Sequence, residues 1–119
     1  MPKVMVVEDD QDLALLLRTV LEDQGYAIET AANGRQALEL LAGENPDLIL
    51  LDMKMPVMNG WQFAEEYHRR YDSPAPIVVL TASEQAARNA REVKASAWLG
   101  KPFDLGTLVS MVRDYLPLG

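Results

Sequence analysis

The sequence predicts an α/β fold, in which a five-stranded parallel β-sheet is covered by helices on both faces. Short apolar runs alternate with amphipathic stretches along the whole chain, and each kind occurs five times. The apolar runs are nearly continuous, which is typical of strands that are buried on both faces. A chain of 119 residues fits one domain with one core, and we expect residues 1–119 to form a single domain.

The five predicted strands are short apolar runs bounded by turn residues or charges. They cover residues 3–7, 26–31, 47–51, 76–80 and 97–100. The second run, YAIETA, is the least apolar, so we place it near an edge of the sheet. We predict strand order 2-1-3-4-5 with right-handed crossovers, since this is a common arrangement for five such units.

The five predicted helices have apolar residues at helical spacing. They cover residues 13–25, 34–43, 61–71, 83–95 and 104–116. In the first helix five apolar residues share one stripe: Leu13, Leu16, Leu17, Val20 and Leu21. We expect Asp10 or Asp12 to cap the start of this helix and Gly25 to end it.

Composition excludes several classes of protein. A formal net charge of −7 argues against direct nucleic-acid binding, which needs a basic surface. No apolar run approaches the roughly 20 residues that span a bilayer. The chain has no cysteine, so neither disulfides nor thiolate metal sites are possible. The start, MPKVMVV, enters strand-like sequence without a basic leader, and we expect a cytoplasmic protein without membrane contact.

Polar residues directly follow four of the five predicted strands. They are Glu8, Asp9 and Asp10 after VMVV, Asp52 after LILL, Thr81 after IVVL, and Lys101 after AWLG. Taken singly, each has an ordinary structural explanation, such as a helix cap or a solvated lysine. The carboxyl ends of parallel strands meet at one edge, so these residues should lie together, with Glu8, Asp9 and Asp52 at the switch in strand order.

The chemistry of this group indicates phosphoryl transfer to an aspartate. Three carboxylates at one edge repel one another, so they favour a divalent cation, and oxygen ligands favour Mg²⁺ over zinc or copper. Lys101 and Thr81 would offer a positive charge and a hydroxyl donor to phosphate oxygens. Asp52 would then be placed to attack phosphorus and form an aspartyl phosphate.

The chain closely resembles the receiver domain of bacterial two-component response regulators over essentially its whole length. Four motifs carry the resemblance: VVEDD at 6–10, LLDMKMPVMNG at 50–60, VVLTA at 78–82 and KPF at 101–103. The resemblance implies a flavodoxin-like (βα)5 sandwich with the strand order given above. It also implies that the output domain, if there is one, lies outside this chain.

The resemblance assigns a role to each residue of the metal site. Asp52 would be the phosphoacceptor, and Asp9 and Asp52 would bind Mg²⁺ directly. Glu8 would bind the ion through water, and the backbone carbonyl of Lys54 would complete the protein ligands. Lys54 and Ser83 stand two residues beyond Asp52 and Thr81 and flank the line of attack on phosphorus. We expect the Lys54 side chain to shield the phosphoryl group from water.

Further residues would respond to the phosphoryl group. By resemblance, Lys101 would bind it, and the Lys101–Pro102 peptide bond would be cis. Thr81 would hydrogen-bond the phosphoryl group and draw its loop inward, coupled to Trp98, which stands where Tyr or Phe is usual. Lys94 stands where the family usually has Gly, so the turn before the fifth strand is expected to differ.

The resemblance also implies partners. A histidine kinase or histidine phosphotransfer protein would donate the phosphoryl group and dock near the first helix, where Leu15 lies opposite the buried stripe. The output face would comprise residues 84–116, and phosphorylation would shift its equilibrium toward an effector or a homodimer.

Three other functions fit the sequence less well. A haloacid-dehalogenase-type phosphatase needs a second aspartate two residues after the nucleophile, and position 54 is lysine. A flavodoxin-like flavin carrier needs a phosphate-binding loop after the first strand, where the acidic EDDQD would repel phosphate. Phosphate transfer on His68, the only histidine, is disfavoured because EEYHRRY is typical of a solvated helix face.

Overall fold

Five parallel strands form one sheet in the order β2-β1-β3-β4-β5, which confirms the predicted fold. The computed structural model describes residues 1–82 and 84–118, so the prediction for Ser83 lies outside the described residues. The strands are β1 (Lys3–Val7), β2 (Ala27–Ala31), β3 (Leu48–Asp52), β4 (Ile77–Thr81) and β5 (Ala97–Gly100). Asp52 and Thr81 are therefore the last residues of their strands rather than the first residues of loops.

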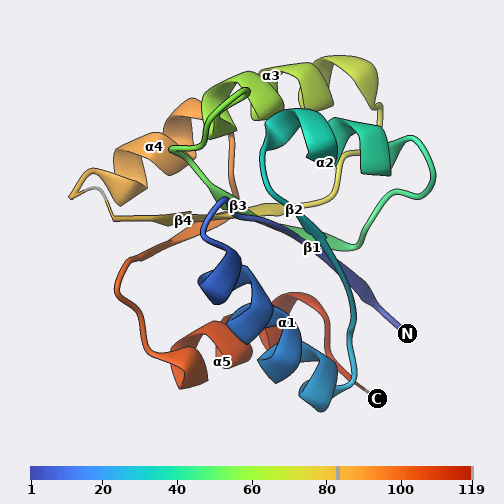
Figure 1. The fold of residues 1–119 in the computed structure, drawn as a ribbon, viewed down its shortest axis with the longest axis vertical. Coiled ribbons are helices and arrows are strands. Elements are labelled where there is room, and N and C mark those ends of the chain that lie inside the picture. Colours follow the sequence, from blue (N-terminus) through green and yellow to red (C-terminus); the bar gives the residue numbers. More distant parts are fainter. Residues whose placement is uncertain (83, 119) are drawn as a thin grey trace.

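The helices lie in two layers, one on each face of the sheet. They are α1 (Gln11–Gln24), α2 (Gly34–Leu41), α3 (Gly60–Arg70), α4 (Ala86–Glu92) and α5 (Leu105–Tyr115). Figure 1 shows α1 and α5 on one face and α2, α3 and α4 on the other. Among the described residues, no helix has both the length and the apolar character that a membrane span requires.

Each face of the sheet has its own hydrophobic core. Successive side chains of a strand point to opposite faces, so Ile49 and Leu51 of β3 pack toward α2, α3 and α4, while Leu48 and Leu50 pack toward α1 and α5. Every residue of β3 and β4 is buried. Burial on both faces explains why these strands are apolar throughout, and it leaves their carboxyl ends as the place for polar chemistry.

The start and end of α1 follow from its caps. The Asp10 side chain accepts hydrogen bonds from the backbone N–H groups of Asp12 and Leu13, so the helix starts at Gln11, two residues before the predicted start. Gly25 ends it in the left-handed conformation, with φ of 108°.

The predicted apolar stripe of α1 is wrong at one position. Leu16 is 44% exposed, whereas Ala14, Leu17 and Leu21 are buried. These three residues follow the i, i+3, i+7 spacing of one helix face, and Leu16 stands on the flank of that face. Leu15 is 63% exposed and lies away from the core, as expected.

Helix α4 is shorter than the 83–95 predicted for it. It begins after Gln85, a residue type that is not favoured at a helix start and whose side-chain oxygen accepts a hydrogen bond from Arg88. It ends at Glu92, and Lys94 then adopts the left-handed conformation with φ of 57°. The turn before β5 therefore places a lysine where glycine is conformationally favoured.

Gly60 allows α3 to start directly against the end of β3. Asn59 and Gln62 form a reciprocal capping box at this helix start. A Cβ atom at Gly60 would lie 2.7 Å from Met53 Sδ and 2.8 Å from the carbonyl oxygen of Asp52. The close approach fixes α3 to the backbone of the strand that carries Asp52.

We expect Gly60→Ala to lower the free energy of unfolding by about 1–3 kcal/mol, because the added methyl group has no space. Urea unfolding of the purified variants measures the change. Gly43→Ala is the matched control, since a Cβ there would meet only the carbonyl oxygen of Leu40, at an ordinary 3.6 Å. Equal effects of the two substitutions would contradict the importance of this contact.

Candidate functional site at the carboxyl edge of the sheet

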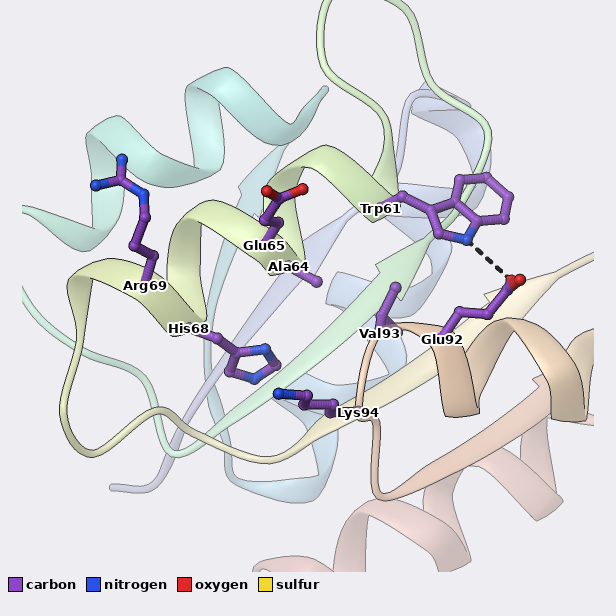
Figure 2. Close-up of a pocket in the computed structure, with 8 residues that line it drawn as sticks. All are labelled: Trp61, Ala64, Glu65, His68, Arg69, Glu92, Val93 and Lys94. Carbon is purple, nitrogen blue, oxygen red and sulfur yellow. Dashed lines mark hydrogen bonds between the residues drawn. The ribbon is translucent and has the colours of Figure 1, made fainter.

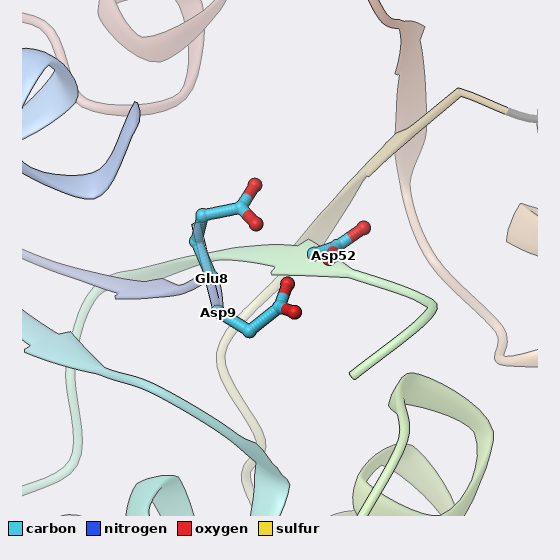
Figure 3. Close-up of side chains that lie close together, drawn as sticks. All are labelled: Glu8, Asp9 and Asp52. Carbon is cyan, nitrogen blue, oxygen red and sulfur yellow. The ribbon is translucent and has the colours of Figure 1, made fainter. Parts of the chain in front are cut away.

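Three carboxylates meet where β1 and β3 lie side by side. Val7 pairs with Leu51, so Glu8 and Asp9, which follow β1, reach the level of Asp52 at the end of β3. One carboxylate oxygen from each of Glu8, Asp9 and Asp52 lies within 4.8 Å of the others. Figure 3 shows these side chains converging from the two strand ends. This is the switch in strand order, as the sequence predicts.

Two of the three carboxylates are buried. Glu8 is 2% exposed and Asp52 is 6% exposed, whereas Asp9 faces solvent. The Lys101 ammonium donates to Glu8 Oε1 at 2.5 Å and lies 3.5 Å from Asp52 Oδ1. The other Glu8 oxygen, Oε2, accepts a hydrogen bond from the backbone N–H of Asp10 at 3.1 Å. One lysine thus balances part of the charge of two buried acids.

Burial and crowding change the protonation of these groups. The pKa of Asp52 is raised from 3.8 to about 7, chiefly by removal from water and then by the neighbouring Glu8 charge, while the Lys101 ammonium acts in the opposite direction. For Lys101, burial acts to lower the pKa, but the hydrogen bond and the charges of Glu8 and Asp52 raise it overall. Lys101 therefore stays protonated at neutral pH.

The donor atoms suit a hard divalent cation. Glu8, Asp9 and Asp52 offer only oxygen atoms, which is the ligand type that Mg²⁺ prefers. Among the residues that the structure describes, this is the one group of three or more acidic or histidine side chains close enough to share an ion. Two of its members are buried next to each other, so a bound cation would remove a repulsion that the fold otherwise maintains.

A cavity of about 280 Å³ adjoins the carboxylates. Its lining residues come from the ends of β3, β4 and β5: Asp52, Lys54, Thr81, Ala82 and Lys101. Thr81 is 1% exposed, while the Lys54 side chain is exposed at the rim. The structure therefore brings the predicted acid, lysine and threonine to one small polar cavity.

The end of β5 is joined to this cavity by the backbone. The Lys101 N–H donates to the carbonyl oxygen of Thr81 at 2.7 Å, and the Lys101–Pro102 bond is cis, as expected from the resemblance. Trp98 is 48% exposed. It pairs with Val79, and Thr81 pairs with Gly100, so Trp98 and Thr81 lie on the same face of neighbouring strands.

Two contributors to the site were not predicted from the sequence. The Asp10 N–H holds one oxygen of Glu8 in place, and Gly60 seats α3 against the Asp52 carbonyl. A glycine directly after an N-cap asparagine is the feature that indicates the close approach.

We expect Asp52→Asn to stabilise the metal-free protein at alkaline pH. Because the folded pKa of Asp52 lies above its unfolded value, the folded protein binds more protons than the unfolded chain between about pH 4 and about pH 7. The wild-type free energy of unfolding should fall as pH rises through this window. In EDTA the variant should be more stable by about 1–3 kcal/mol at about pH 8, and the difference should vanish near about pH 4.

Urea unfolding at several pH values gives this comparison. Asp47→Asn serves as the control, because Asp47 is an exposed aspartate far from the cluster, at the opposite end of β3. A stability difference for Asp52→Asn that does not change with pH would contradict the raised pKa.

Comparisons with known proteins agree on one family. A family model described as the response regulator receiver domain matches residues 4–113. Sporulation initiation phosphotransferase F of Bacillus subtilis is 35% identical over 118 residues, covering 98% of this chain and 94% of that protein. Response regulator MprA of Mycolicibacterium vanbaalenii is 35% identical over 96% of this chain, and the chain spans 50% of its length.

Solved structures show the same fold. The response regulator TrrA of Thermotoga maritima, crystallised in complex with Mg²⁺-BeF, superposes with a TM-score of 0.86 at 32% identity, covering 98% of this chain and 100% of that one. The chemotaxis response regulator CheY4 of Vibrio cholerae gives a TM-score of 0.88 at 34% identity, covering 98% and 99%. Sequence, fold and the acidic cluster therefore coincide, and the chain belongs to the response regulator receiver domain family, the phosphate-accepting modules of two-component signalling.

Proposed function

We propose that Asp52 is the residue that accepts the phosphoryl group, in a reaction that requires Mg²⁺. The observation that carries this proposal is the position of the buried Asp52 carboxylate, next to the acids Glu8 and Asp9 and 3.5 Å from the Lys101 ammonium. A carboxylate in this place has a cation site, a fixed positive charge and a small open cavity beside it. Transfer to aspartate needs little more than such positioning and charge neutralisation.

In the proposed reaction, an Asp52 carboxylate oxygen attacks phosphorus, and the bond between phosphorus and the donor's leaving group breaks. The leaving group keeps that electron pair, and Asp52 becomes an aspartyl phosphate. The phosphorylated state ends by hydrolysis. Water attacks phosphorus and the bond between phosphorus and the Asp52 oxygen breaks, which releases inorganic phosphate and restores the carboxylate. The chain thus catalyses only its own phosphorylation and dephosphorylation.

Each side chain has a distinct role in this proposal. Asp9 and Asp52 would hold Mg²⁺ directly and Glu8 would hold it through water, together with the backbone carbonyl of Lys54. The ion supplies positive charge against the phosphoryl oxygens. The Lys101 ammonium, already 3.5 Å from Asp52, donates to a phosphoryl oxygen. A likeness to TrrA in complex with Mg²⁺-BeF supports this choice of ion.

The buried hydroxyl of Thr81 would report the phosphoryl group to the rest of the domain. Thr81 lines the same cavity as Asp52, and it shares one sheet face with Trp98 on the neighbouring strand. A shift of Thr81 toward the phosphoryl group frees space next to β5. Trp98, now 48% exposed, would then change its position and alter the surface of residues 84–116.

The phosphoryl donor would be a histidine kinase or a histidine phosphotransfer protein. The likeness to Sporulation initiation phosphotransferase F supports a place in a phosphorelay. A cavity of about 530 Å³ between α1 and the start of α2 adjoins the site, and Glu8, Gln11 and Leu15 contribute to its lining. The exposed Leu15 makes this region suitable for a protein partner. The receiving partner would be an effector, or a second copy bound through residues 84–116.

Incubation with acetyl phosphate and Mg²⁺, followed by intact mass measurement, tests the phosphoacceptor. We expect a single phosphate adduct that hydroxylamine removes, because an aspartyl phosphate is an acyl phosphate. The adduct should be absent without Mg²⁺ and in Asp52→Asn. Asp12→Asn, which changes an exposed acid next to the cluster, should keep it. An adduct that survives in Asp52→Asn would refute the assignment.

We expect Lys54→Ala to shorten the lifetime of the phosphorylated protein several-fold. The exposed Lys54 side chain stands at the rim of the Asp52 cavity and would restrict the approach of water to phosphorus. Loss of the adduct over time, followed by mass, gives the rate. Lys54→Arg keeps length and charge and should retain most of the lifetime. An unchanged rate in Lys54→Ala would show that this side chain gives no protection.

A further inference from the structure

A further cavity, separate from the two described above, lies between α3 and α4, outside the phosphorylation site. It has a volume of about 440 Å³, larger than the 280 Å³ beside Asp52. Its main lining residues are Trp61, Ala64 and His68 from α3, and Glu92, Val93 and Lys94 from the end of α4 and the turn after it. Figure 2 shows these side chains facing one another across the gap between the helices.

The two ends of this cavity differ in charge. At one end, the Trp61 indole N–H donates to Glu92 Oε1 at 3.1 Å and joins α3 to α4. At the other end, Figure 2 shows the Lys94 ammonium directed at the imidazole of His68. The buried side chains of Ala64 and Val93 lie between the two ends. The cavity therefore has an apolar middle and one end formed by two groups that can carry positive charge.

The other charges around His68 are either engaged or directed elsewhere. Arg69 pairs with Glu66 at 2.7 Å, and Glu92 is shared between Trp61 and Arg88. Figure 2 shows Glu65 pointing away from His68. Among the described residues, neither His68 nor Lys94 has a carboxylate oxygen within 4.0 Å.

The backbone holds Lys94 in this position at a cost. Its φ of 57° is the left-handed conformation, which a residue with a Cβ atom adopts with strain. Burial lowers the pKa of His68 below its usual value, and the charge of Lys94 lowers it further. A bound anion would offset the charge of Lys94 and raise the pKa of His68 again.

We propose that the α3–α4 cavity binds a small anionic ligand, with its phosphate or carboxylate group between the His68 imidazole and the Lys94 ammonium. The remainder of the ligand would lie over Ala64 and Val93, toward Trp61. The Lys94 ammonium donates a charge-assisted hydrogen bond, which is the strong kind, and the bound anion would favour protonation of His68 so that it does the same. Binding would hold the turn after α4 against α3. The site shares no residue with the Asp52 cavity, so it does not rest on the proposed function.

Titration of the His68 imidazole by NMR tests the site. The protein is the wild type in EDTA, where the metal-free acids Glu8, Asp9 and Asp52 repel anions from the phosphorylation site. Inorganic phosphate and acetate are added separately, each compared with chloride at equal ionic strength. We expect a saturable shift of the His68 signals and a higher His68 pKa with at least one of the two anions. A response to phosphate alone indicates a phosphate-bearing ligand, and a response to acetate alone indicates a carboxylate.

Variants of two lysines complete the test. Lys94→Gly removes the ammonium and suits the left-handed turn, so it should fold and should weaken anion binding about tenfold, the loss expected for one charge-assisted hydrogen bond. Lys3→Gln removes a lysine at the start of β1, outside both this cavity and the Asp52 cavity, and should leave anion binding unchanged. The Trp61 indole signal gives a second readout at the far end of the cavity. A shift that chloride reproduces, or one that persists fully in Lys94→Gly, overturns the proposal.

Discussion

The structure depends on keeping two buried carboxylates, Glu8 and Asp52, next to each other. Buried carboxylates are costly when unpaired, and two of them in contact also repel. The fold meets this cost with one lysine, whose ammonium lies against both acids, and with a backbone N–H that binds the remaining oxygen of Glu8. The compensation is incomplete, since the pKa of Asp52 remains raised to about 7. The site is thus built to accept further positive charge.

This arrangement constrains the strands that supply it. Lys101 reaches the acids from just beyond the end of β5, the edge strand, and its backbone N–H is bonded to the carbonyl oxygen of Thr81. Thr81 is itself the final residue of β4. The acid from β3, the hydroxyl from β4 and the ammonium after β5 are therefore held by backbone pairing rather than by flexible loops. Such a frame gives the reacting groups fixed positions before any ligand arrives.

Much of this could be predicted from the sequence, because the relevant signals are local. Five apolar runs predict the strands. The polar residues that follow these runs are therefore predicted to lie at one edge of the sheet: Glu8, Asp9, Asp52, Thr81 and Lys101. What could not be predicted depends on tertiary contacts. The exposure of Leu16 follows from how α1 sits on the sheet, and the early end of α4 follows from the left-handed turn at Lys94. The bridging of two acids by Lys101 requires side-chain distances that no periodicity encodes.

Gly60 and α4 together make the two sides of the site mechanically unequal. On one side, the start of α3 is pressed against the carbonyl of Asp52 and the sulfur of Met53, so α3 and β3 must move as one body. On the other side, α4 has seven residues and begins five residues after Thr81. A displacement at the carboxyl edge of the sheet is therefore resisted by α3 and is more easily followed by α4. Because α3 is fixed to β3, a movement that starts at the acids is passed on to α4.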